Sequence, residues 1–242
     1  MKTRVISVDL WGTVFDFNTE ISVSARRRQL ISEYAEKLGF ADKSALDSAY
    51  LDTSLHFGNT YREEARLMTP KERLEHQLNL VGLSPNGNGF DDLVCNVQNA
   101  LLEIPPPLAP NVKDGLNALA QEFTLVIVSD TGFSPGTVIR KIFDKYQIAE
   151  YFSDHSFSDE TGTAKPDSVA FTSVLDRVKC DPAESLHIGD TEWTDIKGAS
   201  ALGAKTCLYV GLNDEYLDGT KADHILRDWN DAPQLVKLIK AS

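Results

Sequence analysis

The stretch RVISVDLWGTVFDF, residues 4–17, carries the pattern that decides the fold of this 242-residue chain. A short, mostly apolar run leads up to Asp9, and a Gly12–Thr13 turn follows it. Apolar runs of this length that end in a polar residue are typical of buried strands. We therefore expect a strand that delivers the Asp9 carboxylate to the edge of a sheet.

Similar runs recur through the second half of the chain. They are FTLVIVSD (123–130), HSFSD (155–159), SLHIGD (185–190), KTCLYVG (205–211) and ADHIL (222–226), the last as an edge strand. Helical patterns lie between them, at 110–122, 136–148, 167–178 and 194–203. Strands and helices in alternation predict a parallel sheet covered on both faces, with its polar strand ends along one edge.

The chain between residues 19 and 103 has a purely helical pattern instead. SARRRQLISEYAEKLGF (24–40) predicts an amphipathic helix, in which arginines 26–28 are expected to form a solvated basic face. The proline-rich IPPPLAP (104–110) cannot lie inside a helix and returns the chain to the sheet.

These two patterns predict an α/β protein with a Rossmann-like parallel sheet and an inserted, all-helical cap domain. The expected boundaries are residues 1–17 and 105–242 for the α/β core domain and residues 18–104 for the cap domain. A helical insert placed over the strand ends can close on a ligand and exclude water.

Composition narrows the classes of partner. The net charge of −12 argues against a nucleic-acid backbone as the partner. The three cysteines, Cys95, Cys180 and Cys207, are odd in number and widely spaced, so we expect buried thiols and a cytoplasmic protein without disulfides. No run approaches the roughly 20 apolar residues of a membrane span, so no membrane partner is expected. Nothing in the sequence indicates an oligomeric state.

Four polar clusters fall at the predicted strand ends and helix starts. They are Asp9, Ser129, Lys165 in TAKPDSVAF (163–171), and Asp190 with Asp195 in GDTEWTD (189–195). Their order, together with a helical insert after the first strand, resembles the haloacid dehalogenase (HAD) superfamily of hydrolases. The resemblance covers most of the chain and implies a hydrolase that acts through an aspartyl nucleophile.

The residue types suit such chemistry. A carboxylate such as Asp9 can attack phosphorus or carbon and form an intermediate that water then cleaves. Lys165 can neutralise a phosphoryl oxygen, and Ser129 can donate a hydrogen bond to it. The catalytic residues expected are Asp9, Ser129 and Lys165. The residues expected to bind the phosphoryl group are Gly12, Thr13, Ser129, Asp130 and Lys165, where Asp130 adds a negative charge at a position that is commonly an amide in related enzymes.

Asp190 and Asp195 would bring two further carboxylates close to Asp9. Three converging acids repel one another, and a bound Mg²⁺, which prefers oxygen ligands, removes the repulsion. The resemblance implies that Asp9, the backbone carbonyl of Trp11 and Asp190 hold Mg²⁺, with Asp195 as a direct ligand or one step removed. A helix N-cap is the alternative for Asp195.

Trp11 departs from the phosphatase pattern. HAD phosphatases usually carry a second aspartate at this position, which protonates the leaving group and then activates water. An indole N–H does neither. We therefore expect a cation site with impaired acid–base catalysis.

Several interpretations of Trp11 remain open. In the first, the enzyme acts on good leaving groups or takes an acid from the cap, where His56 and His76 are candidates. In the second, it resembles 2-haloacid dehalogenases, which carry an aromatic residue here, or phosphonoacetaldehyde hydrolases, for which Lys71 would be the cap lysine. A member that binds a phosphorylated ligand without turnover is the non-enzyme alternative. Because Asp190 and Asp195 stand at metal-site spacing, we favour a Mg²⁺-dependent, phosphatase-type hydrolase of a small phosphorylated metabolite.

Overall fold

The computed structural model describes residues 2–16, 23–64, 66–85, 87 and 89–241. No helix within these ranges is long and apolar enough to cross a membrane. The chain divides into two compact units. The core unit comprises Met1–Asn18, Pro106–Asp130 and Phe143–Ser242, and the helical unit comprises Thr19–Pro105 and Thr131–Ile142. The predicted domain boundaries stay a prediction. In addition to the predicted insert, residues 131–142 group with the helical unit.

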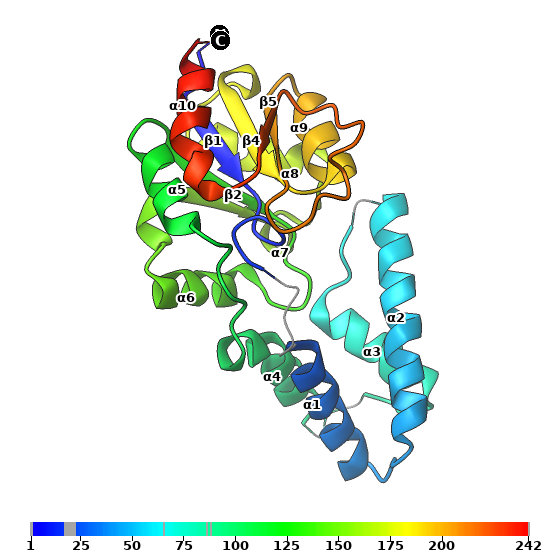
Figure 1. Ribbon diagram of the computed structural model, residues 1–242. Helices are drawn as coiled ribbons and strands as arrows, with labels where there is room; N and C mark the ends of the chain where they lie inside the picture. The colour runs from blue at the N-terminus through cyan, green and yellow to red at the C-terminus, as the bar shows by residue number, and fades with distance from the viewer. Residues whose placement is uncertain (1, 17–22, 65, 86, 88, 242) are drawn as a thin grey trace. The chain divides into compact units, whose positions relative to one another are not determined.

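The core unit holds one six-stranded, fully parallel sheet (Figure 1). Its strands are β1 (Val5–Val8), β2 (Thr124–Ser129), β3 (Phe152–Phe157), β4 (Ser185–Gly189), β5 (Lys205–Tyr209) and β6 (His224–Leu226). They lie in the order β3-β2-β1-β4-β5-β6. Together with the helical insert after β1, this confirms the predicted α/β fold. The third strand begins at Phe152, three residues before the predicted 155.

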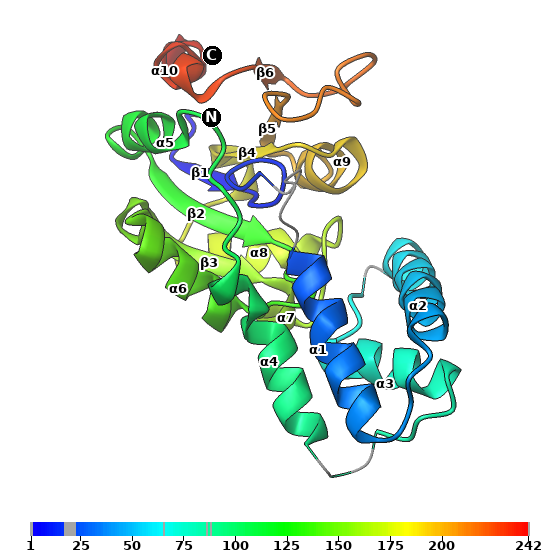
Figure 2. The ribbon, with the colours of Figure 1, turned by 60° about the horizontal axis from the view of Figure 1, so that its bottom comes forward.

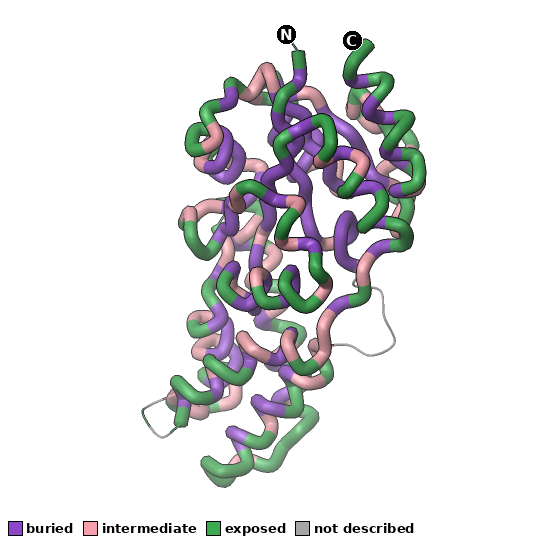
Figure 3. Tube along the Cα trace, turned by 90° about the vertical axis from the view of Figure 1, so that its left-hand side faces the viewer, coloured by how far each residue is buried: buried purple, intermediate pink, exposed green. Residues whose placement is uncertain are grey.

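The central strands β2, β1 and β4 are almost entirely buried. Every residue of β1 and β4 is buried, as is β2 after its first residue, which Figure 3 shows as buried trace through the sheet. β1 lies between β2 and β4, with Val8 opposite Ile127 on one side and Ile188 on the other. Because the three strands are parallel, the residues that follow them emerge at one edge of the sheet.

Helices cover both faces of this sheet (Figures 1 and 2). On one face α8 (Ser168–Arg177) and α9 (Lys197–Ser200) pack against Val5, Val126 and Val128. On the other face lie α5 (Val112–Ala120) and α10 (Ala232–Ala241). The remaining helices of the second half are α6 (Gly136–Tyr146), α7 (Ser158–Thr161), single turns at Ala149–Tyr151, Pro182–Glu184 and Trp229–Asp231, and a π-helical turn at Glu192–Ile196.

The helical unit contains α1 (Val23–Lys37), α2 (Lys43–Glu64), α3 (Pro70–Leu80) and α4 (Phe90–Glu103). These helices share an apolar cluster of their own that includes Leu74, Phe90 and Val97. The start of α3 is fixed by a capping box, in which Thr69 and Glu72 satisfy each other's backbone N–H groups. The unit therefore has its own core and, at α3, its own helix-start signal.

The three cysteines are free thiols. Cys180 and Cys207 are buried, as predicted, but Cys95 is exposed, so the prediction was wrong for that residue. It lies on α4, whose buried residues are Phe90, Leu93, Val97, Ala100 and Leu101, and the helical period turns position 95 away from them.

Candidate active site

The predicted strand-end residues gather within the core unit. Asp9 follows β1, and its backbone N–H donates to the carbonyl of Ile188 at 2.9 Å, so the β1–β4 ladder extends to the carboxylate. Ser129 is the last residue of β2, and Asp190 follows β4. The topology alone places these three residues at the same edge.

Lys165 links two of the acids. Its Nζ lies 2.6 Å from Asp9 Oδ1 and 2.6 Å from Asp195 Oδ1. The three side chains are at most 5% exposed. The backbone N–H of Lys165 donates to Asp130 Oδ1 at 3.1 Å, so the predicted phosphate-binding residue Asp130 holds the loop that presents the lysine. A buried ammonium shared by two carboxylates is a strongly oriented charge.

Asp195 is held from several sides. His187 Nε2 lies 3.0 Å from its Oδ1, and the backbone N–H of Thr191 donates to its Oδ2 at 3.0 Å. A Cβ placed on Gly189 would lie 2.3 Å from Asp195 Cγ, so only glycine permits this approach. An N-cap would need contacts only with the start of a helix. The carboxylate of Asp195 instead links the turn at Thr191 to His187 on β4 and to Lys165.

Two residues of this network escaped sequence reasoning. His187 is fully buried, and its ring contacts Asp195 and, through Nδ1, the hydroxyl of Ser7 at 2.8 Å. Ser7 and His187 are register partners in β1 and β4. Two polar residues inside otherwise apolar strands were the signal that could have identified them.

The charges of the cluster do not balance within the protein. Burial raises the pKa of Asp9 well above its usual range, and Lys165 offsets this only in part. Burial and the neighbouring charge of Asp195 raise the pKa of Asp190 to about 7. Burial would also raise the pKa of Asp195, but Lys165 and the hydrogen bond from His187 together lower it below its ordinary value. Lys165 therefore stabilises the charged form of Asp195. It does not supply enough positive charge to stabilise Asp9 and Asp190 as well.

The three aspartates fit a metal ion. Asp9, Asp190 and Asp195 each offer a carboxylate oxygen, and these oxygens lie within 4.8 Å of one another. An all-carboxylate donor set suits a hard divalent cation such as Mg²⁺. A cation would also relieve the repulsion that raises the pKa values of Asp9 and Asp190. The cluster can hold a metal.

Two hydroxyls at the same edge have no protein partner. Ser129 Oγ and Thr13 Oγ1 are buried and form no hydrogen bond with a described residue. Gly12, before Thr13, adopts φ +78°, the left-handed conformation that lets the turn after β1 form. A buried hydroxyl without a partner is costly, and a ligand oxygen would satisfy it.

Trp11 has a definite structural position. Its indole Nε1–H donates to the backbone carbonyl of Asp130 at 3.0 Å, and its ring packs 5.7 Å from that of Phe15, centroid to centroid. No described residue donates to its own carbonyl oxygen, which the resemblance assigns to a metal ion. The side chain thus links the loop after β1 to the end of β2.

The other candidates lie in the helical unit. The rings of His56 and His76 stack at 4.5 Å between centroids. Burial and the adjacent His56 lower the pKa of His76. Lys71 is exposed and forms an ion pair with Asp91 at 3.7 Å. Nothing in these contacts links them to a reaction.

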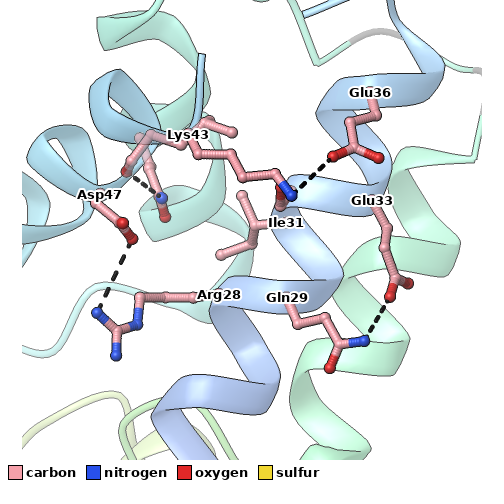
Figure 4. Close-up of a pocket in the computed structure, with 10 residues that line it drawn as sticks. Arg28, Gln29, Ile31, Glu33, Glu36, Lys43 and Asp47 are labelled. Atoms are coloured by element: carbon pink, nitrogen blue, oxygen red, sulfur yellow. Dashed lines mark hydrogen bonds and ion pairs between the residues drawn. The ribbon is translucent and has the colours of Figure 1, made fainter. Parts of the chain in front are cut away.

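The helical unit also contains a cavity of about 460 Å³ (Figure 4). Most charged groups of its wall are already paired: Lys43 with Glu36, and Arg28 with Asp47. Gln29 donates to the nearby Glu33. The cavity therefore offers little free charge that would select an anionic ligand.

Comparison with known proteins agrees with this fold. The family model of the haloacid dehalogenase-like hydrolases matches residues 3–203, most of the chain. The chain belongs to this family of hydrolases.

Relatives within the family differ in activity. A phosphoglycolate phosphatase of Vibrio parahaemolyticus is 26% identical over 89% of this chain and 86% of its own length. The chain spans about half the length of some other curated relatives it matches. Among solved structures, a 2-haloacid dehalogenase of Pseudomonas syringae superimposes with a TM-score of 0.73 at 21% identity, over 98% of this chain and 99% of that one. The HAD-hydrolase YfnB of Bacillus subtilis, solved with bound magnesium, gives 0.66 at 20%, over 99% of both chains. At these identities the two structures establish the fold alone.

Proposed function

We propose that this chain is a Mg²⁺-dependent phosphatase that hydrolyses a small phosphorylated metabolite through Asp9. The observation that carries the proposal is the cluster of three carboxylates, two of which share the ammonium of Lys165. Displacement of a halide needs one nucleophilic carboxylate, whereas Asp190 and Asp195 add negative charge that is useful only beside a cation. The match to a phosphoglycolate phosphatase over most of both chains supports the phosphatase type.

The proposed reaction uses Asp9 twice. Its carboxylate oxygen attacks phosphorus as the bond from phosphorus to the leaving oxygen breaks, which gives an aspartyl phosphate. Water then attacks the same phosphorus, releases inorganic phosphate and restores the carboxylate. Lys165 favours the charged form of Asp9 and neutralises a phosphoryl oxygen. The remaining phosphoryl contacts are proposed for Gly12, Thr13 and Ser129, with Asp130 holding the Lys165 loop.

Asp9, the carbonyl of Trp11 and Asp190 would hold the cation. Asp195 would lie beside it, as a ligand or through water. When bound, Mg²⁺ neutralises phosphoryl charge and orients the group for attack. Because Trp11 carries no proton-transfer group, we propose substrates whose leaving group departs with little help from an acid. The three free cysteines support a reducing, cytoplasmic setting.

Hydrolysis of p-nitrophenyl phosphate and acetyl phosphate, with and without Mg²⁺, tests the proposal. Both leaving groups depart without a proton. We expect Mg²⁺-dependent turnover that Asp9→Asn abolishes. Asp114→Asn, which makes the same change on the exposed surface of α5, is the matched control and should leave turnover intact. Turnover that is independent of Mg²⁺, or that survives in Asp9→Asn, would contradict the proposal.

Dehalogenation is the second candidate. The specific observation in its favour is the aromatic Trp11, because a departing halide needs no protonation. Release of chloride from chloroacetate without metal, together with no phosphatase activity, would replace the proposal with this one. No activity in either assay would favour a protein that binds a phosphorylated ligand without turnover.

A further inference from the structure

The loop that follows β1 is held by a residue from the far end of the chain. The indole Nε1–H of Trp229 donates to the backbone carbonyl of Thr13 at 3.0 Å, and both residues are fully buried. Trp229 begins the single turn that precedes α10, beyond residue 203, where the family match ends. A residue outside the matched segment therefore contacts the loop that carries the first motif.

This hydrogen bond fixes one peptide unit of the loop. The carbonyl of Thr13 and the N–H of Val14 belong to the same planar group. The N–H donates to the carbonyl of Leu10 at 2.9 Å, and the carbonyl accepts from Trp229. A planar unit that is bonded at both ends cannot rotate without breaking one of the bonds. The direction in which Thr13 faces is set accordingly.

The surroundings of the indole are fitted to it. A Cβ built on Gly115 of α5 would lie 2.6 Å from ring atom Cε3 of Trp229, so a larger residue would displace the ring. The ring of Tyr209, at the end of β5, packs against the indole at 5.5 Å between centroids. The preceding Asp228 accepts a hydrogen bond from the side chain of Asn111, next to α5, at 3.0 Å. The indole thus has a defined position from which to hold the loop.

Packing alone does not explain the contact. An apolar ring would fill the same space, whereas a buried indole N–H needs an acceptor. The acceptor here belongs to Thr13, whose own hydroxyl is buried without a described partner. The backbone of Thr13 is therefore bonded while its hydroxyl is left available for a ligand oxygen.

We infer that Trp229 is a positioning residue, which orients Thr13 for contact with the phosphoryl group. The contact with phosphate rests on the proposed phosphatase function, whereas the anchoring of the loop does not. Trp229 acts through Thr13 and not on the substrate itself. Removing its N–H should therefore weaken phosphate binding without removing any group that contacts phosphate.

Two replacements of Trp229 remove the hydrogen bond. Trp229→Phe removes the N–H together with part of the ring, and 3-benzothienylalanine at this position keeps the shape of the indole but has sulfur in place of the N–H. We expect both to raise the KM for p-nitrophenyl phosphate and the Ki for inorganic phosphate by up to about 10–100-fold, the range for a hydrogen bond to a charged group. A smaller folded fraction would lower the apparent kcat alone.

Leu235→Ala is the matched control for stability. Leu235 lies on α10 and is buried, so its truncation lowers Tm but leaves the hydrogen bond of Trp229 in place. KM and Ki should stay unchanged in this variant. If Leu235→Ala raises Ki as much as Trp229→Phe does, or if neither Trp229 replacement raises Ki in an active phosphatase, Trp229 is a structural residue only and the inference is overturned.

Amide hydrogen exchange separates this inference from the proposed function, because it needs no substrate. The N–H groups of Val14 and Phe15, which both donate to Leu10, should exchange faster relative to those of β1 in both Trp229 replacements, but not in Leu235→Ala. Faster exchange in a protein that hydrolyses no phosphate ester would leave the anchoring of Thr13 standing and refute the phosphatase alone. Unchanged exchange would overturn the inference whatever the activity.

Discussion

Asp190 and Asp195 belong to one carboxylate cluster, yet replacing them with asparagine should change stability in opposite directions. Asp195 accepts hydrogen bonds from Lys165, His187 and the backbone of Thr191. Asp190 accepts hydrogen bonds from nearby in the chain, from the hydroxyl of its neighbour Thr191 at 3.3 Å and from its own backbone N–H. In the metal-free protein the carboxylate of Asp195 is stabilised by its surroundings, and the carboxylate of Asp190 is not.

The pKa of Asp190 gives the sign and size of its effect. It is about 7 in the folded protein against an ordinary value of 3.8. The folded protein therefore holds this proton more tightly than the unfolded chain does. The resulting stability is complete below about pH 4 and is lost as the pH rises through about 7. At pH 8 the loss is at most about 4 kcal/mol, and at pH 5 it is less than half of that.

Asp195 behaves differently because its pKa is lowered, so the carboxylate is charged at both pH values. Breaking its contacts with Lys165 costs about 3–5 kcal/mol. For a protein of this size, about 2–4 °C of Tm accompanies each kcal/mol. We expect Asp195→Asn to lower Tm by about 6–20 °C at pH 5 and at pH 8. Asp190→Asn should raise it by up to about 8–16 °C at pH 8 and by much less at pH 5.

Thermal unfolding of EDTA-treated protein, followed by circular dichroism, measures both effects. Adding Mg²⁺ should raise the Tm of the wild type more at pH 8 than at pH 5, because the cation replaces the proton on Asp190. Asp190→Asn should lose most of this response. If Asp190→Asn lowers Tm in the metal-free protein at pH 8, the carboxylates do not repel one another as argued here.

Two other positions give sharp tests. Trp11→Asp supplies an acid–base group and should raise kcat/KM for an alkyl phosphate by up to about 10²–10⁴-fold, with a smaller change for p-nitrophenyl phosphate. Trp11→Phe is its control, because it loses the hydrogen bond to Asp130 and gains no acid. Equal changes for both substrates in Trp11→Asp would contradict the reasoning. Gly189→Ala should lower Tm by several degrees because its Cβ would meet Asp195, whereas Gly58→Ala, with open space inside α2, should stabilise the protein by about 0.5–1 kcal/mol. A Gly189→Ala protein with unchanged Tm would refute the close approach.

The parallel sheet and the positions of the strand-end residues could be predicted because local sequence pattern indicates both. Each strand is a short apolar run, and parallel pairing then fixes which ends meet. The third strand was placed late because its first half is unusual for a strand: Ser153 is exposed, and Asp154 accepts hydrogen bonds from Arg177 on α8. That contact is tertiary, and no local pattern indicates it.

Two buried arginines, Arg27 and Arg73, illustrate a second limit, and the expectation of a solvated basic face at residues 26–28 was wrong for Arg27. RRR at 26–28 and KER at 71–73 both resemble exposed helix faces, since charged residues surround them. Arg27 and Arg73 turn inward because Phe133, more than 50 residues further along the chain, supplies an aromatic surface for both. Phe133 lies in residues 131–142, the segment that groups with the helices. Sequence pattern predicted the elements but not which segment they would pack against.

Trp11 and Asp130 both depart from the pattern of related enzymes, and hydrogen bonds connect the two residues to each other and to Lys165. The carbonyl of Asp130 accepts the indole N–H, and its carboxylate accepts the backbone N–H of Lys165. Lys165 in turn binds Asp9, so contacts link Trp11 through Asp130 and Lys165 to the proposed nucleophile. An aspartate at position 11 would gain proton transfer but lose the first of these contacts. The activity gained by Trp11→Asp should therefore fall below the full value of general acid–base catalysis, by as much as the looser position of Lys165 costs.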